Sequence, residues 1–504
     1  MNPTQPAKLF WLILFAVFWA FYGLTGRDAW KAEEALALGP VLDWLGDGGR
    51  AWQAPAPLYT VAAGLMAQGA AAWFDIQDGA RLASGVFALA GLLFTALAAR
   101  SLFGPGFGPT AVLSMLGCLG LMLRMHALAP ETALLAAWAA LLAGVALGRA
   151  SFLAGGVLIG LALVALALGL RGLPDLAAGL GLVLLPLLAR EWRQPHYYRT
   201  LALGLGLLAV LGAGALLYLN GSGHLGEWLH WHDRFPSRAT RSHALSEFLW
   251  FAWPVWPLAL ATIWHEHRRL RRARELHLPL LALLVALLAS QVPAWSRDGG
   301  LLPLLPPLAL LAAYGVHTLK RGAAQAFYWF GVACFLFFLF AFWLYFAAIE
   351  WGVPAKLAAH VARLTPAYRP GSAGDTALPL LATGLWLIAI PLFPRATIRP
   401  VLVWASGMVL IWTLLVALYR PWAEAGWGYR PLIADLSRHL PAGACLKVET
   451  DPAMHTMLRY HLHPAQRPDC PWLLTSAKRD ATPLWEGARP RHKQQRYRLY
   501  RIEQ

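Results

Sequence analysis

Apolar residues dominate this chain in runs that approach twenty residues, and short polar stretches separate the runs. A helix needs about twenty apolar residues to cross the hydrocarbon core of a bilayer, and windows of that length predict about thirteen spanning helices. They lie near residues 8–25, 81–102, 108–125, 132–149, 151–170, 173–190, 199–219, 246–264, 277–295, 301–319, 324–349, 378–393 and 400–419. The pattern therefore predicts an all-α polytopic membrane protein, with residues 1–419 as its transmembrane domain.

The first apolar run lies near the N-terminus, where a signal peptide would also lie. Lys8 precedes the run, and bulky apolar and aromatic residues continue through Tyr22. No small-x-small cleavage site follows before the next charged residues, although a secretory signal would need one. We therefore interpret this run as an uncleaved first span.

The loops between the predicted spans differ in their content of Lys and Arg. The strongest cluster lies at residues 268–274, and Arg100, Arg190 and the Lys320-Arg321 pair fall on the same side of the membrane. Loops rich in Lys and Arg stay in the cytoplasm. With an odd number of spans, we expect a multi-pass membrane protein whose N-terminus is cytoplasmic and whose C-terminus lies outside the cytoplasm.

The segment from Leu58 to Phe74 is apolar enough to be counted as a further span. Counting it would move the most basic loops to the outer side, against the charge rule. We therefore predict that it is a juxtamembrane helix at the outer interface. Residues 26–79 then form one large first periplasmic loop, and a loop of that length is more often functional than passive.

The chain becomes polar after Tyr419. Residues 432–440 have the pattern of a short amphipathic helix, whereas 445–449, 472–474 and 497–502 have that of short strands. We predict a small periplasmic α/β domain over residues 420–504. Cys445 and Cys470 lie within it and are candidates for a disulfide if this domain is outside the cytoplasm.

Charged residues are scarce, so their positions are informative. Hydrophobic residues make up 58% of the chain and Asp, Glu, Lys and Arg only 13%, with a net charge of +16. The cations sit mostly at the ends of apolar runs, where they set topology and meet lipid headgroups, so we find no sign of nucleic-acid binding. The segment Arg27–Glu34 concentrates three carboxylates and two cations at a membrane boundary. It is either a solvated loop or a site for a charged substrate.

Two later outer segments are also long and polar. Residues 221–246 carry His224, His230, His232 and Asp233, but their spacings match no standard set of metal ligands. Residues 351–376 carry Lys356, His360 and Arg363 at spacings that give one helix a polar face.

Several short motifs follow one another in an order that is typical of one enzyme family. They are the acidic cluster after the first span, Ala56-Pro57-Leu58-Tyr59, the ARLASG sequence at 80–85, Glu131 at the start of the fourth span, and Ser296-Arg297-Asp298 ahead of 301–308. In this order the chain resembles the polyprenyl-phosphate-dependent glycosyltransferases of the GT-C class. Within that class it resembles the aminoarabinose (4-amino-4-deoxy-L-arabinose) transferase-like branch, which is related to the protein O-mannosyltransferases.

The resemblance implies a GT-C-like fold and an inner-membrane glycosyltransferase. Such an enzyme transfers a sugar from undecaprenyl phosphate, a polyprenyl phosphate, to a lipid or glycan acceptor such as lipid A on the periplasmic side. The reaction needs a carboxylate that accepts the proton of the acceptor hydroxyl, and cations that stabilise the phosphate leaving group.

The family's outer loop carries an Asp-Glu pair, and its acid nearest the membrane acts as the base. One alignment places Glu33 and Glu34 on this pair. The other places Asp28 on the Asp and Lys31 on a following Arg. We prefer the first alignment and keep the second open.

The resemblance assigns roles to the other charged residues as well. Glu131 matches a second family acid, which orients the acceptor or a metal. The expected phosphate and substrate ligands are Arg27, Lys31, Tyr59, Arg81 and Arg297. No cofactor is certain, and a divalent metal held by Glu34 and Glu131 stays open.

The chain departs from the family at its key acids. Glu stands where the family has Asp, and the Pro-Leu-Tyr element lacks the family's preceding Lys. An added methylene displaces a carboxylate, and a displacement of about 1 Å can cost about a hundredfold in rate. A catalytically weakened relative that binds a lipid-linked glycan or a partner protein is therefore the first alternative. A transporter is the second, but the two halves show no clear repeat.

Overall fold

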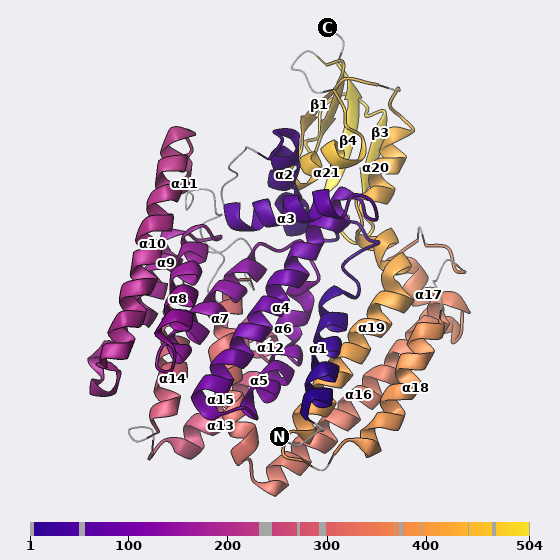
Figure 1. Ribbon diagram of the computed structural model, residues 1–504. Helices are drawn as coiled ribbons and strands as arrows, with labels where there is room; N and C mark the ends of the chain where they lie inside the picture. Colours follow the sequence, from indigo (N-terminus) through magenta and orange to yellow (C-terminus); the bar gives the residue numbers. More distant parts are fainter. Residues whose placement is uncertain are drawn as a thin grey trace.

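The computed structural model describes residues 5–49, 56–230, 244–269, 273–291, 299–366, 368–371, 376–394, 396–441, 443–465 and 470–502. A bundle of helices forms most of the molecule, and a small sheet lies beyond one end of it (Figure 1). The N-terminus lies toward the opposite end of the bundle. The polar C-terminal part is therefore separated from the apolar helices along the long axis of the molecule.

The helices of the bundle follow the apolar runs of the sequence. They are α1 (Gln5–Phe21), α4 (Ile76–Phe103), α5 (Phe107–Leu116), α6 (Leu119–Met125), α7 (Glu131–Leu147), α8 (Phe152–Ala167), α9 (Leu173–Leu184), α10 (Pro195–Gly221), α12 (Ala244–Phe251), α13 (Val255–Glu266), α14 (Arg274–Ala289), α15 (Leu305–Thr318), α16 (Arg321–Glu350), α18 (Ala377–Leu392) and α19 (Arg399–Trp427). Short 3₁₀ turns precede α10 at Leu185–Leu188 and Arg190–Trp192, and another precedes α15 at Gly299–Leu304. A five-residue helix, α11 (Leu225–Leu229), follows α10.

Five helices of the described chain are long and apolar enough to cross a membrane, or six if α5 and α6 count as one span. Shorter apolar helices, among them α1, α7, α8 and α18, lie at further predicted spans. The protein is thus a multi-pass membrane protein by composition and helix length. The number of about thirteen spans remains a prediction.

The third predicted span is broken instead of continuous. α5 and α6 meet at an angle of 71°, and the break lies at Gly117 and Cys118. The indole of Trp404, on α19, donates a hydrogen bond of 2.9 Å to the carbonyl oxygen of Gly117. A side chain that takes a helical carbonyl in this way is an ordinary cause of a kink.

Glycines allow α7 and α8 to approach each other closely. A Cβ atom at Gly155 would lie 2.5 Å from the Cα atom of Gly148, and one at Gly144 would lie 2.9 Å from the backbone nitrogen of Ile159. Small residues at such crossings are typical of membrane helices, whose association depends on close packing.

The segment between α1 and α4, predicted to be the first outer loop, contains α2 (Ala32–Gly46) and α3 (Pro57–Gly69). α3 lies across the end of the bundle, and α2 lies beyond α3, beside the C-terminal elements (Figure 1). Pro57 starts α3 at a position where a missing N–H costs nothing. Helices therefore occupy the part of the loop for which juxtamembrane helices were predicted.

The C-terminal domain is a four-stranded mixed sheet with two helices. Its elements are α20 (Arg430–Ser437), β1 (Leu446–Glu449), α21 (Pro452–His461), β2 (Trp472–Thr475), β3 (Trp485–Ala488) and β4 (Arg496–Arg501), and the strand order is β1-β2-β4-β3. β1 pairs with β2 in parallel, with Leu446 opposite Trp472. β4 pairs with β2 and β3 antiparallel.

The buried apolar residues of this domain belong to a hydrophobic cluster that extends into α2. Leu38 and Val41 of α2 belong to the same buried cluster as Leu436, Met457 and Leu499 of the C-terminal domain. Arg459 of α21 also forms a 2.6 Å ion pair with Asp43 of α2. The segment between α1 and α4 and the C-terminal domain are therefore stabilised together.

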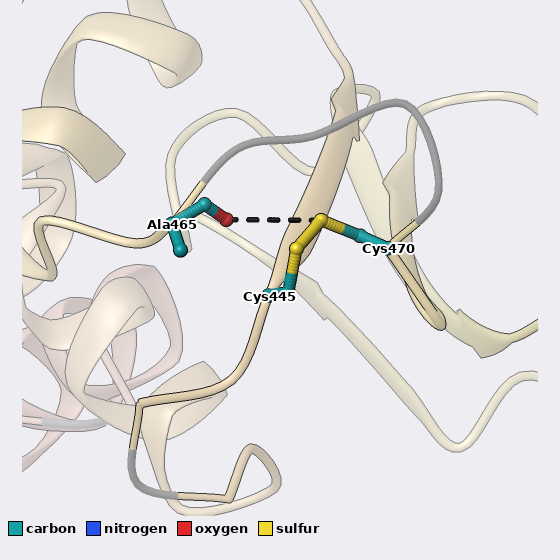
Figure 2. Close-up of a disulfide and its surroundings, with 3 residues drawn as sticks. All are labelled: Cys445, Ala465 and Cys470. Atoms are coloured by element: carbon teal, nitrogen blue, oxygen red, sulfur yellow. Dashed lines mark hydrogen bonds between the residues drawn. A yellow bond between two sulfur atoms is a disulfide. The ribbon is translucent and has the colours of Figure 1, made fainter.

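A disulfide joins Cys445 to Cys470 and closes a sequence separation of 25 residues (Figure 2). The Cys470 sulfur lies 3.8 Å from the carbonyl oxygen of Ala465, which accepts a 2.9 Å hydrogen bond from the Leu446 amide. The disulfide thus links Cys445, just before β1, to Cys470, which precedes Pro471 and the start of β2 at Trp472.

We predict that Gly155→Val lowers the thermal unfolding midpoint of the protein in detergent. The added methyl groups would overlap the α7 backbone, and such overpacking costs about 1–3 kcal/mol. Gly206→Val, on α10, is the matched control, because nothing lies within 4 Å of a Cβ atom there. Equal midpoints for the two variants would contradict the close α7–α8 crossing.

We also predict that Cys445→Ser with Cys470→Ser destabilises the C-terminal domain. A cross-link over a loop of this length stabilises by about 3 kcal/mol. Limited proteolysis should cut the double variant within 443–502 faster than the oxidised wild type. The wild type should be cut as fast as the variant once its disulfide is reduced. A Cys118→Ser variant is the control, because Cys118 is a free, buried cysteine of the bundle.

Candidate functional site

The charged segment that follows α1 is folded into the protein. Arg27, Asp28 and Glu34 are 7%, 0% and 4% exposed, respectively. Gly26 and Glu34 are held by hydrogen bonds to other elements. The segment is therefore not a solvated loop.

Glu34 lies between two buried arginines. Its Oε1 atom accepts hydrogen bonds from Arg27 Nη2 at 2.9 Å and Arg81 Nε at 2.7 Å, and its Oε2 atom accepts one from Arg27 Nη1 at 2.9 Å. Arg81 also donates to Asp78 Oδ1 at 2.6 Å and to the Arg27 carbonyl at 2.7 Å. Two cations and two anions thus balance one another in a site that excludes water.

The pKa of Glu34 reflects this balance. Burial raises the pKa of the carboxyl group, but the charges of Arg27 and Arg81 and their hydrogen bonds more than offset burial and lower it to about 2. Glu34 is therefore an anion at every physiological pH. A carboxylate with so low a pKa is a poor proton acceptor.

The same cluster holds the loop between α6 and α7. Arg27 Nη2 donates to the carbonyl oxygen of His126 at 2.5 Å, and Glu34 Oε1 accepts from the Leu128 amide at 3.1 Å. Tyr59 and Ser84 share a 2.6 Å hydrogen bond, and the Tyr59 hydroxyl accepts from the Ala129 amide at 3.0 Å. This loop leads directly into Glu131, so the cluster determines where Glu131 begins α7.

Glu131 is 1% exposed and is the first residue of α7. Pro130 precedes it at the N-cap of α7. The carboxylate therefore lies in the first turn of the helix, where the helix dipole favours a negative charge. Its position at the helix N-terminus accounts for an acid at this point of the chain.

Asp28 connects the charged segment to the C-terminal domain. Its Oδ2 atom accepts hydrogen bonds from the amides of Tyr429 and Arg430 at 2.7 and 2.6 Å, at the start of α20. His461 Nε2 lies 3.2 Å from Oδ1. Burial raises the pKa of Asp28, but the hydrogen bond and charge of His461 and the Arg430 amide leave it below its usual value. Asp28 thus stabilises an interface between distant parts of the chain.

Glu33 differs from these acids in its exposure. Its side chain is 39% exposed, and its Oε2 atom lies 2.8 Å from Nη1 of Arg124, whose side chain is 6% exposed. Arg124 lies in the last turn of α6. Lys31 precedes α2 and is exposed. The solvent-accessible charges of the segment are therefore Glu33 and Lys31.

Our sequence reasoning missed Arg124 and a second buried ion pair. Arg171 Nη2 lies 2.6 Å from Asp175 Oδ1, and both side chains are almost completely buried. Each arginine interrupts or ends an apolar run. A charged residue in a membrane segment usually has a partner, so this position in the sequence could have identified both arginines. Sequence spacing alone does not identify the partner of Arg124, which lies 91 positions away.

Some of the predicted site residues lie outside the described residues. These are Arg297 with its neighbours Ser296 and Asp298, and also His232 and Asp233. Within the described ranges, no group of three or more His, Cys, Asp or Glu could hold a metal ion. The oxygens of Glu34 already accept from two arginines, so this carboxylate does not offer a metal an unpaired negative charge.

The fold is shared with two solved structures. Crystal structures of ArnT from Cupriavidus metallidurans superpose on this chain with TM-scores of 0.67 when bound to undecaprenyl phosphate and 0.66 in the apo state. The fold of this chain is similar to that of ArnT. The superpositions cover 92% and 91% of this chain and 86% of each ArnT chain, at 18% and 17% sequence identity.

The sequence matches no protein-family model, and no protein of curated function matches it in sequence. The similarity to ArnT, an aminoarabinose transferase of the GT-C fold, is therefore a similarity of fold. It confirms the GT-C resemblance suggested by the order of short motifs.

We predict that Glu34→Gln destabilises the protein in a pH-dependent manner. Removing the carboxylate charge leaves Arg27 and Arg81 buried together, and breaking a buried pair costs about 3–5 kcal/mol. Because the folded-state pKa of about 2 is below the ordinary 4.5, this stabilisation is complete above the ordinary value and is lost as pH falls toward 2.

The measurement is the difference in thermal midpoint between wild type and variant as the pH is lowered from neutral to about 3, and we expect this difference to shrink. Glu33→Gln is the matched control, because the same chemical change at the exposed neighbour should cost about 1 kcal/mol or less. A Glu34→Gln midpoint equal to that of the control would contradict the buried cluster.

Proposed function

We propose that this protein is an inner-membrane glycosyltransferase that uses a sugar linked to undecaprenyl phosphate. The acceptor is a lipid or glycan such as lipid A on the periplasmic side. The observation that carries the proposal is a fold similar to that of ArnT over 92% of the chain. One of the two ArnT structures holds undecaprenyl phosphate. The folded charged segment at the end of the bundle supports it.

Glu33 is the proposed base. It is the most exposed carboxylate of the segment, and it lies at the start of α2 beside Arg124. In the proposed step the carboxylate accepts the acceptor's hydroxyl proton while the hydroxyl oxygen bonds to the sugar's anomeric carbon. The bond from that carbon to the phosphate oxygen breaks, and the phosphate leaves with the electron pair. Arg124, Lys31 and Arg297 are candidates to stabilise its charge.

The remaining predicted site residues have positioning roles in this proposal. Arg27, Arg81 and Tyr59 use their polar atoms within the protein, where they hold Glu34 and the loop before Glu131. Asp28 holds the C-terminal domain against the segment. Glu131 is also buried, so we place it in a positioning role at the start of α7, where the resemblance has an acid that orients the acceptor or a metal. The second alignment, in which Asp28 is the base, is less consistent with its complete burial.

A catalytically weakened relative is the second candidate. The Glu33 carboxylate is already paired with Arg124 in this structure, and the family has the shorter Asp at this position. A protein of this kind would bind the lipid-linked sugar without transferring it.

We predict that Glu33→Gln reduces sugar release from a radiolabelled polyprenyl-phospho-sugar by about 10²–10⁴-fold, the usual contribution of a general base. The assay uses the full-length protein in detergent. Glu33→Asp should retain activity because it keeps the carboxylate and restores the residue of the family. Binding of the labelled carrier should persist in all three proteins.

Asp28→Asn separates the two alignments, in which the base is either Glu33 or Asp28. We expect Asp28→Asn to lower the thermal midpoint. The turnover per folded molecule should stay close to that of the wild type. Loss of turnover in Asp28→Asn with Glu33→Gln still active would show that the preferred alignment is wrong. Binding without turnover in the wild type would identify the weakened relative.

A further inference from the structure

A second charged site lies where the C-terminal domain meets α17 (Ala355–Leu364). A cleft of about 490 Å³ is lined by Arg363 and Leu364 at the end of α17 and by residues 490–495 between β3 and β4. The two sides of the cleft come from segments more than a hundred residues apart. The sequence pattern indicated only that α17 has a polar face.

The lining of this cleft is basic. Arg363, Arg491 and Lys493 contribute three cations, and no Asp or Glu is among the described residues that line it. Burial and the nearby charge of Arg489 lower the pKa of His492, so this ring adds a neutral donor at neutral pH. Like charges that face one cavity repel one another, and a bound anion relieves that repulsion.

Arg491 is held in a fixed orientation. Its guanidinium lies over the rings of Trp422 and Trp427, with centroid distances of 5.2 and 4.9 Å. A stacked guanidinium presents a planar set of donors, which suits the oxygens of a phosphate. The aromatic pair thus preorganises one wall of the cleft.

Two buried polar atoms beside the cleft have no hydrogen-bond partner in the described part of the chain. They are Arg491 Nε and the hydroxyl oxygen of Thr365, which is 2% exposed. Both residues lie against Gly426, whose Cβ position would be 3.4 Å from Arg491 Cγ and 3.2 Å from the Thr365 oxygen. Buried donors of this kind normally have an acceptor. Both atoms are closed to solvent in this structure, so they lie behind the cleft and are not themselves counted as contacts of the ligand.

The cleft lies at the border of the apolar bundle. α17 follows the long apolar helix α16 and precedes the apolar helix α18, at the end of the bundle nearer the sheet (Figure 1). Glu350, at the end of α16, accepts hydrogen bonds from the Tyr368 hydroxyl and the Gly371 amide and so fixes the turn after α17. Trp residues at such a border lie at the depth of lipid headgroups.

We propose that this cleft binds the phosphate of an anionic membrane lipid. The site is separate from Glu33, but it is connected to the charged segment. Arg489, two positions before Arg491, donates hydrogen bonds to the carbonyl oxygens of Trp30 and Trp427 at 3.3 and 3.1 Å. A lipid held in the cleft therefore lies beside the segment that leads into α2. This proposal does not depend on the transferase reaction, because binding is measured without turnover.

The test is lipid binding to the full-length protein in detergent, measured by native mass spectrometry. The probes are phosphatidic acid, diacylglycerol with the same acyl chains, and inorganic phosphate. Arg363→Ala with Lys493→Ala should weaken phosphatidic acid binding by about tenfold or more, because each cation near an anionic lipid contributes measurably. Lys478→Ala with Arg501→Ala removes the same charge from exposed positions elsewhere in the domain and should leave binding unchanged.

Three results would overturn the proposal. Diacylglycerol binding as tight as that of phosphatidic acid would show that the phosphate is not recognised. Inorganic phosphate competing at the same concentration as phosphatidic acid would identify a site for free anions. Equal loss in the cleft and control variants would indicate a general charge effect.

Arg491→Lys keeps the charge but removes the planar guanidinium, and we expect it to weaken phosphatidic acid binding.

Glu33→Gln distinguishes this proposal from the transferase. We expect that variant to bind phosphatidic acid as the wild type does, even where its turnover is lost. A failure of the lipid-binding test thus leaves the proposed reaction unaffected.

Discussion

The buried ion cluster around Glu34 is the interaction on which the candidate site depends. Removing ions from water is costly, so such a cluster persists only where each charge is paired and hydrogen-bonded. Arg27, Arg81, Asp78 and Glu34 meet this condition, because each arginine contacts a carboxylate and at least one backbone carbonyl. The cluster joins the end of α1, the start of α2, the start of α4 and the loop before α7. The four candidate catalytic carboxylates, Asp28, Glu33, Glu34 and Glu131, lie on or next to these elements.

Asp28 extends this arrangement to the C-terminal domain. Its carboxylate accepts from two backbone amides at the start of α20, and Glu424 of α19 accepts from the Asp28 amide and the Trp30 indole. Together with the hydrophobic cluster shared by α2 and α21, these contacts make the polar domain a support for the segment between α1 and α4. A small domain with little core of its own gains stability in this way.

Local patterns predicted much of the fold. The charge rule separated residues 58–74 from the spans, and the structure places α3 across the end of the bundle there. Alternating residues indicated β1, β2 and β4, but β3 at Trp485–Ala488 is short and contains Gly487, so its pattern is weak. The kink between α5 and α6 was also missed, because the hydrogen bond that accompanies it comes from Trp404, far away in sequence.

The sequence alone defined the apolar runs, the charged segment and the acids that could act in it, because composition and period are local properties of the chain. Only the tertiary structure distinguished those acids from one another. Glu33 and Glu34 are neighbours on α2, and one residue turns a helix by about 100°. That rotation directs Glu34 toward Arg27 and Arg81 and leaves Glu33 half-exposed beside Arg124. Adjacent identical residues thus have different environments, since burial and ion pairing depend on elements that are distant in sequence.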